Sequence, residues 1–156
     1  MTEIAWEGKP MTEARQQREL TRDEALWLLG TVPLGRVVFT HRALPAIRPV
    51  NHVVDGHRVI FRTGGSAAIT TAVDGTGTIV AFEADAIDSV RRTGWSVVVI
   101  GGARLLTDAV EVGRYLRVLQ PWAAGTKDDI IVIRTDLVTG VLVGADDIGG
   151  ARGPAS

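Results

Sequence analysis

Cysteine is absent from this chain of 156 residues, and its absence removes several kinds of chemistry. Without thiols the chain can form no disulfide, no thiolate nucleophile and no cysteine metal site. An excess of either charge is also missing, since 17 Lys and Arg face 18 Asp and Glu and leave a formal net charge of −1. No overall basic field attracts nucleic acid or an anionic membrane, so neither is an expected partner.

Long hydrophobic runs are missing as well. Apolar stretches such as Val97–Ile100 are far too short to span a bilayer, and residues 1–20 contain no apolar signal-peptide core. We therefore expect no membrane association and a cytoplasmic location. The remaining composition, with 46% hydrophobic and 22% charged residues, is that of an ordinary globular protein whose length suits one domain.

Familiar catalytic motifs are also scarce. Ser66 stands in TGGSAA, which lacks the G-x-S-x-G frame of a hydrolase nucleophile, and Gly75 and Gly77 lack the third glycine of a dinucleotide fingerprint. His52 and His57 flank a predicted turn with no carboxylate cluster at a ligand spacing. We therefore predict no metal site and interpret the two histidines as turn or surface residues.

The sequence predicts a mainly β domain with short helices. Thr21 and Glu24 form a capping-box pattern at the start of a leading helix, and Asp108 and Glu111 repeat that pattern before a second helix. Short turns between the strands favour an antiparallel barrel with peripheral helices over a doubly wound sheet. The predicted strands are Val37–Phe39, Ala46–Val54, His57–Thr63, Thr78–Ala84, Trp95–Leu106, Ile130–Ile133 and Gly140–Val143. The last two can be separate strands or one bent strand. A short helix or loop is expected at Ala67–Val73.

The ends of the chain differ in composition from the rest. Residues 1–19 are expected to form a flexible arm, residues 20–145 the domain, and residues 146–156 a disordered, glycine-rich tail. The letters MTE occur at Met1 and again at Met11, so translation can begin at either.

The predicted hairpin Ala46–Ser66 carries polar residues that a structural hairpin does not need. Along its second strand, Arg62 precedes Thr63, two glycines and Ser66. An arginine, two hydroxyls and backbone N–H groups turned toward one point suit a phosphate. The alternative is a glycine turn beside a surface arginine.

The first strand of this hairpin contains a proline. Pro49 cannot donate to a ladder, so it is expected at a strand edge, where backbone groups of Arg48 and Val50 can lack a strand partner. Such groups, with the donor and acceptor of Asn51, suit the polar rim of a planar ligand. The alternative is an edge strand protected by its proline and arginine.

Two further pairs of residues leave alternatives open. Glu83 and Asp85 point to the same face of a predicted strand, either as an acid–base pair or as solvent-facing carboxylates. Trp95 and Trp122 can wall a flat aromatic ligand or pack in the core.

Together these segments resemble the pyridoxamine 5′-phosphate oxidase-like superfamily, the flavin-binding split barrels. The resemblance spans roughly residues 20–145 and includes a branch whose members use FMN or the deazaflavin coenzyme F-420. The matching segments occur in the family's order and are LGRVVF, RPVN, IFRTG, VAFEADAID, GWSVVVIGGARLL and PWAAGTKDDIIVIRTDLVTGVLV.

The resemblance implies a six-stranded antiparallel split β-barrel that forms a homodimer, with a cofactor in each groove of the dimer interface. It assigns the ring system to Arg48, Pro49, Val50 and Asn51, the ribityl phosphate to Phe61, Arg62, Thr63 and Ser66, and a place near the cofactor to Trp122. One departure concerns the phosphate. Many members place a lysine just after the loop serine, whereas Ala67 stands there in this chain.

The hypothesis that follows is an FMN-dependent oxidoreductase that transfers hydride or electrons to a small organic substrate. The cofactor supplies the chemistry in such an enzyme, which accounts for the scarcity of catalytic side chains. Three alternatives stay open: a deazaflavin-dependent reductase, a non-catalytic flavin- or haem-binding protein, and a split-barrel interaction module without a cofactor.

Overall fold

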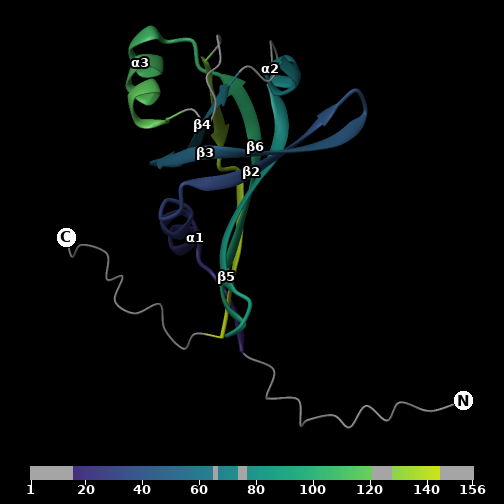
Figure 1. Ribbon diagram of the computed structural model, residues 1–156, viewed down its shortest axis with the longest axis vertical. Helices are drawn as coiled ribbons and strands as arrows, with labels where there is room; N and C mark the ends of the chain where they lie inside the picture. Colours follow the sequence, from purple (N-terminus) through teal and green to yellow (C-terminus); the bar gives the residue numbers. More distant parts are fainter. Residues whose placement is uncertain (1–15, 65–66, 74–76, 121–127, 145–156) are drawn as a thin grey trace, which may run out of the picture.

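Eight strands and three helices make up the part of the chain that the computed structural model describes, which is residues 16–64, 67–73, 77–120 and 128–144 (Figure 1). In chain order they are β1 Gln17–Glu19, α1 Arg22–Leu29, β2 Leu34–His41, β3 Leu44–Asp55, β4 Arg58–Gly64, α2 Ala67–Val73, β5 Thr78–Asp88, β6 Thr93–Leu105, α3 Ala109–Val118, β7 Asp128–Arg134 and β8 Leu137–Val143.

Six of these strands close into an antiparallel barrel. Pairing runs in the order β6, β5, β2, β3, β4 and β7, and the contact of β7 with β6 closes the ring. β8 pairs with β6 beyond the ring, and β1 pairs with β8. The prediction of a six-stranded split barrel with short helices is therefore confirmed, and two further strands extend it.

β7 and β8 follow each other along β6. Ala103 pairs with Ile133 in the first ladder, and Ile100 pairs with Leu137 in the second, so the register shifts by one residue between them. The chain thus forms two strands where a single bent strand was the alternative. Gly101 lies at this shift, where a Cβ atom would stand 1.7 Å from the carbonyl oxygen of Arg134.

The leading helix begins as the sequence predicts. Thr21 Oγ1 accepts from the Glu24 N–H at 3.2 Å, and the Glu24 carboxylate accepts from the Thr21 N–H at 3.0 Å. Arg18 of β1 also donates to this carboxylate at 3.0 Å. The Arg18 bonds and then the Thr21 N–H lower the pKa of Glu24 to about 2. β1 thus lies inside the segment expected to be a flexible arm.

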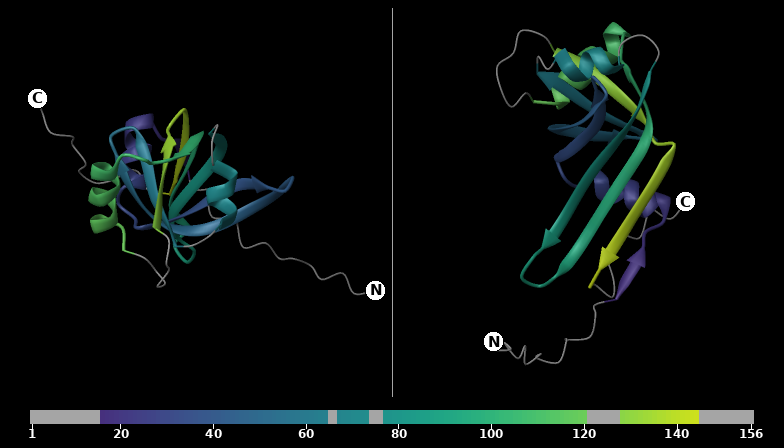
Figure 2. Two further views of the ribbon diagram at one scale, coloured as in Figure 1. Left: turned by 90° about the horizontal axis from the view of Figure 1, so that it is seen from above. Right: turned by 90° about the vertical axis from the view of Figure 1, so that its right-hand side faces the viewer.

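Two apolar clusters stabilise this arrangement. The larger fills the barrel and continues under α1, with Phe61 and Phe82 fully buried. The smaller lies between α3 and the outer faces of β4 and β7, around Ile60, Tyr115 and Leu119. Figure 2 shows β5, β6 and β8 side by side with no helix across them, so the helices cover other faces of the sheet. None of the helices in the described ranges is long and apolar enough to cross a membrane.

Candidate functional site

The residues predicted to bind a cofactor lie where β3 and β4 separate. β3 pairs with β2 from Leu44 to Asn51, but its pairing with β4 starts only at His52. Past Phe61, β4 continues along β7 alone. Arg62 and Thr63 therefore flank one side of the divergence, and the first half of β3 flanks the other.

The first half of β3 has one open edge within the described residues. The His52 N–H donates to Pro33 at 3.0 Å on the β2 side. Since alternate residues of a strand direct their backbone groups to opposite sides, Arg48 and Val50 face β2, and Pro49 faces the open edge. Pro49 therefore removes no hydrogen bond from the β2–β3 ladder, as expected. The prediction that the backbone groups of Arg48 and Val50 lack a strand partner is wrong, because both residues face β2.

Asn51 and Arg62 bind the C-terminal end of α3. Asn51 Nδ2 donates to the carbonyl oxygen of Gln120 at 3.0 Å. Arg62 Nη1 donates to the carbonyls of Leu119 at 2.8 Å and Leu116 at 3.4 Å. Carbonyls in the last turn of a helix lack intrahelical partners and carry its negative end charge, so an amide and a guanidinium suit them. Both residues therefore anchor this helix.

A second anchor holds the body of α3 against the β3–β4 turn. The Tyr115 hydroxyl donates to the Asp55 carboxylate and accepts from Arg58 and Arg114, both at 2.9 Å. Burial, followed by the bond to Asp55, raises the pKa of Tyr115. Glu111 lies 3.5 Å from Arg58. The signal for this anchor was the single tyrosine of the chain on an apolar helix face, because a buried hydroxyl needs partners.

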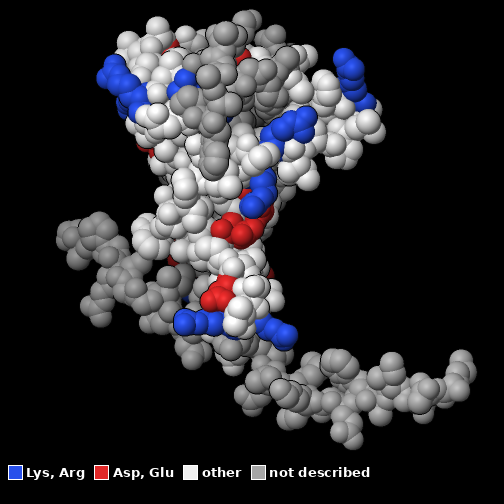
Figure 3. Space-filling view, in the orientation of Figure 1, with Lys and Arg blue, Asp and Glu red and all other residues white. Residues whose placement is uncertain are grey.

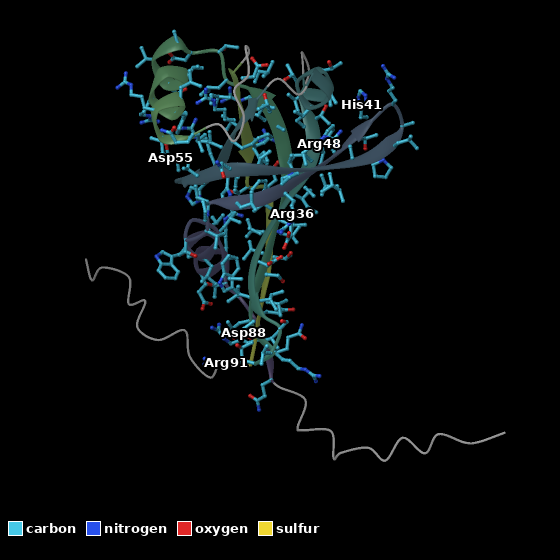
Figure 4. All side chains as sticks on the ribbon, in the orientation of Figure 1. Arg36, His41, Arg48, Asp55, Asp88 and Arg91 are labelled. Atoms are coloured by element: carbon cyan, nitrogen blue, oxygen red, sulfur yellow. The ribbon has the colours of Figure 1, made fainter. Side chains whose placement is uncertain are left out.

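Four of the predicted residues, Arg48, Val50, Phe61 and Thr63, lie on the inner side of the sheet, whereas Pro49 shares the outward phase of Asn51. Val50, Phe61 and Thr63 are buried, and Thr63 Oγ1 donates to the Asp129 carbonyl at 3.5 Å. Arg48 shares their side but is exposed, with its guanidinium 5.9 Å from the ring centre of Phe39 and 2.8 Å from the Ile47 carbonyl. Figure 4 shows Arg48 beside the hairpin that β2 and β3 form, away from Asp55.

The predicted set is therefore divided between two faces. Asn51 and Arg62 lie on the outer face, whereas Arg48 lies on the inner one. A planar ligand can meet both sides only by crossing the open edge of β3. Ser66 and Trp122 lie outside the described residues.

Two sequence interpretations are resolved by burial. His52 is a core residue and not a surface one, with 4% of its area exposed. Its Nε2 donates to the Leu29 carbonyl at 2.7 Å, and its ring meets Phe82 edge-on at 4.8 Å. Burial lowers the pKa of His52. His57 is exposed at the turn, and Trp95 packs in the core.

Comparisons with known proteins agree with this architecture. The chain is 51% identical over 136 residues to the uncharacterized protein Rv0080 of Mycobacterium tuberculosis, covering 85% of this chain and 90% of that one. A crystal structure from Corynebacterium glutamicum, named for pyridoxamine 5′-phosphate oxidase, matches with a TM-score of 0.70 and 29% identity, over 84% of this chain and 96% of that one. An FAD binding protein from Mycobacterium smegmatis matches with a TM-score of 0.68 and 33% identity, over 82% and 99%.

A family model gives the assignment. The model of pyridoxamine 5′-phosphate oxidase matches residues 21–142, which is most of the chain and includes every barrel strand. The chain belongs to the pyridoxamine 5′-phosphate oxidase family.

Proposed function

We propose that this protein is a flavin-dependent oxidoreductase that binds FMN at the interface of a homodimer and acts on a small organic substrate in the cytoplasm. Family membership supports a flavin, and the Mycobacterium smegmatis relative, an FAD binding protein at 33% identity, makes FAD the second candidate. The bound flavin supplies the hydride or electron transfer, so the chain need only bind and orient it.

The observation that carries this proposal is the open edge of β3 beside Arg62. A flavin ring presents alternating carbonyl and N–H groups along one rim, and an unpaired strand edge offers the complementary pattern. Pro49 keeps that edge from pairing with another strand, because it has no N–H to donate. The Asn51 amide, whose Nδ2 already donates to Gln120, adds its Oδ1 acceptor and its second N–H at the point where the two strands separate.

The phosphate end depends on Arg62. Its Nη1 donates to two carbonyls of α3, so a phosphate bound at Arg62 would compete with this helix for the guanidinium. On the Thr63 side of β4, the Asp129 carboxylate accepts from Thr70 of α2 at 3.1 Å and adds negative charge there. With Ala67 in place of the usual lysine, we expect weaker phosphate binding than in members that have the lysine, by about 1–3 kcal/mol.

Separate titrations test the proposal. FMN, FAD and the deazaflavin coenzyme F-420 are added in turn to purified cofactor-free protein, and binding is followed by the fluorescence of each ring. We expect micromolar binding of FMN or FAD that falls at least about tenfold in Arg62→Ala, equivalent to about 1.4 kcal/mol. Arg91→Ala, an exposed arginine at the β5–β6 turn, is the matched control and should bind as the unaltered protein does.

The outcomes separate the candidates. Tight binding of F-420 with weak binding of both flavins would replace the flavin by the deazaflavin. No binding of any ring at about 100 µM would refute the oxidoreductase proposal. Bound flavin that reductants reduce but no substrate reoxidises would indicate a carrier in place of an enzyme.

A further inference from the structure

One short helix holds two of the polar side chains that the proposed function assigns to the flavin. Arg62 Nη1 donates to the carbonyls of Leu119 at 2.8 Å and Leu116 at 3.4 Å. Asn51 Nδ2 donates to the carbonyl of Gln120 at 3.0 Å. All three carbonyls lie at the C-terminal end of α3. This end of the helix therefore meets the candidate site at the residue for the ring and at the residue for the phosphate.

The carbonyls at Arg62 resemble a phosphate in their chemistry. The C-terminal end of a helix carries partial negative charge, and its unpaired carbonyl oxygens accept N–H bonds as phosphate oxygens do. A phosphate carries full charge and forms stronger, charge-assisted bonds with a guanidinium. The phosphate of a flavin is thus a ligand that can replace Leu119 and Leu116 at Arg62.

Few buried contacts hold α3 on the sheet. Tyr115 is its one buried residue, whereas Val110 and Val118 are 81% and 59% exposed. The helix has 10 residues, which is too short to be stable alone in water, and Gly113 in its middle lowers its stability further. α3 therefore depends on its anchors and can open locally while the barrel stays folded.

The Tyr115 hydroxyl is an anchor that lies away from the candidate site. It donates to Asp55 and accepts from two arginines at the β3–β4 turn, and Figure 4 labels Asp55 near the end of α3. The Leu119 N–H donates to the Tyr115 carbonyl at 2.8 Å, so the anchor and the carbonyl at Arg62 belong to one helical turn. A change at Tyr115 therefore acts on Arg62 without altering a residue of the site.

The solvent-facing side of α3 is basic. Arg114 and Arg117 are exposed on this helix, and Figure 3 shows Lys and Arg atoms at the upper left, where Figure 1 places α3. Positive charge at this end of the molecule raises the local concentration of an anionic ligand. A flavin with a phosphate is therefore favoured here over a flavin ring alone.

We propose that α3 is an autoinhibitory helix, whose last carbonyls and the phosphate of a flavin exclude each other at Arg62. Tyr115 is then a positioning residue that sets the affinity for the cofactor through α3. This inference rests on the proposed function and adds a regulation of the same site. Only protein with the last turn of α3 open binds the phosphate, so the dissociation constant is the intrinsic one divided by the open fraction.

FMN and riboflavin test the inference, because riboflavin has the same ring but no phosphate. Riboflavin needs no opening of α3, since the Asn51 amide keeps an acceptor and a second N–H for the ring. Dissociation constants are measured by flavin fluorescence on the full, cofactor-free chain. We expect Tyr115→Phe to bind FMN at least about threefold more tightly and riboflavin unchanged, because loss of the bond to Asp55 raises the open fraction. Val110→Ala, exposed on the same helix, is the matched control and should bind both as the unaltered protein does.

Two further variants test the direction of the effect. In Arg62→Ala the additional change Tyr115→Phe should give no gain, because no carbonyl is left to displace. In Gly113→Ala the new Cβ would meet no atom within 4 Å, so the helix is stabilised and FMN binding should weaken by about three- to fivefold. Saturation with FMN should also speed hydrogen exchange of the Leu119 amide, whereas a ligand that leaves α3 in place would not.

The outcomes distinguish this inference from the proposed function. A folded Tyr115→Phe that binds FMN no more tightly than the unaltered protein would overturn the inference and leave the flavoprotein intact. An equal gain for riboflavin would overturn it too. Binding of FMN by Tyr115→Phe alone at about 100 µM would support both proposals, and no binding by any variant would overturn both.

Discussion

The buried histidine makes acid stability the sharpest stability test of this structure. His52 is 4% exposed, its Nε2 donates to Leu29, and its Nδ1 has no hydrogen-bond partner among the described residues. Burial therefore favours the neutral ring and lowers the pKa of His52 from 6.5. Just below pH 6.5, His52 is therefore protonated in the unfolded chain and neutral in the folded chain.

The sign of the effect follows from this difference. The contribution of neutral His52 is complete above pH 6.5 and is lost as the pH falls below that value, until the lowered folded pKa is reached. Within this window one proton changes the free energy of unfolding by about 1.4 kcal/mol per pH unit at most. Urea unfolding followed by tryptophan fluorescence between about pH 7.5 and pH 5 measures it.

The comparison uses two glutamine variants. In His52→Gln the amide can still donate toward Leu29 but cannot titrate, so its free energy of unfolding should be lower at neutral pH and should lose the slope below pH 6.5. His57→Gln, at the exposed turn, should behave as the unaltered protein does. Glu83, whose raised pKa acts in the opposite direction, cancels in the difference. Equal slopes in His52→Gln and the unaltered protein would refute the assignment of the lowered pKa to His52.

Two further predictions concern close contacts. Gly101→Ala should destabilise the protein by about 3 kcal/mol or more in thermal unfolding, because its Cβ would lie 1.7 Å from the Arg134 carbonyl oxygen. In the control Gly102→Ala the new Cβ meets its nearest atom at 3.5 Å, so this variant should lose less than about 1 kcal/mol. Similar losses in the two variants would contradict the register shift at β6. Tyr115→Phe should destabilise by about 1–3 kcal/mol in urea unfolding, because it removes the hydroxyl that donates to Asp55, and an unchanged midpoint would mean that α3 does not depend on this anchor.

Local patterns predicted the elements well because short-range chemistry decides them. The capping box at Thr21 forms as expected, and so does the hairpin around the Asp-Gly turn. Strand alternation likewise puts Arg58 and Arg62 on one side of β4, and both bind α3. In each case the residues that determine the feature are neighbours in the chain.

The candidate site was harder to predict because it depends on distant pairings. The bond from Asn51 to Gln120 joins residues 69 positions apart, and the separation of β3 from β4 is set by β7. No local pattern in the hairpin sequence predicts this bond or the point at which the two strands separate. His52 is different, since it shares the inward phase of β3 with Val50, and the same alternation could have indicated its burial.

β6 belongs to two hydrogen-bonded systems at once. Its end at Ala103–Leu105 closes the barrel through β7, and its stretch from Gly94 to Ile100 holds the open sheet through β8. Because one continuous strand pairs in both, we expect the open sheet and the barrel to unfold together. A force on the open sheet, for example from a bound molecule, is therefore transmitted to the closed barrel through the backbone of β6.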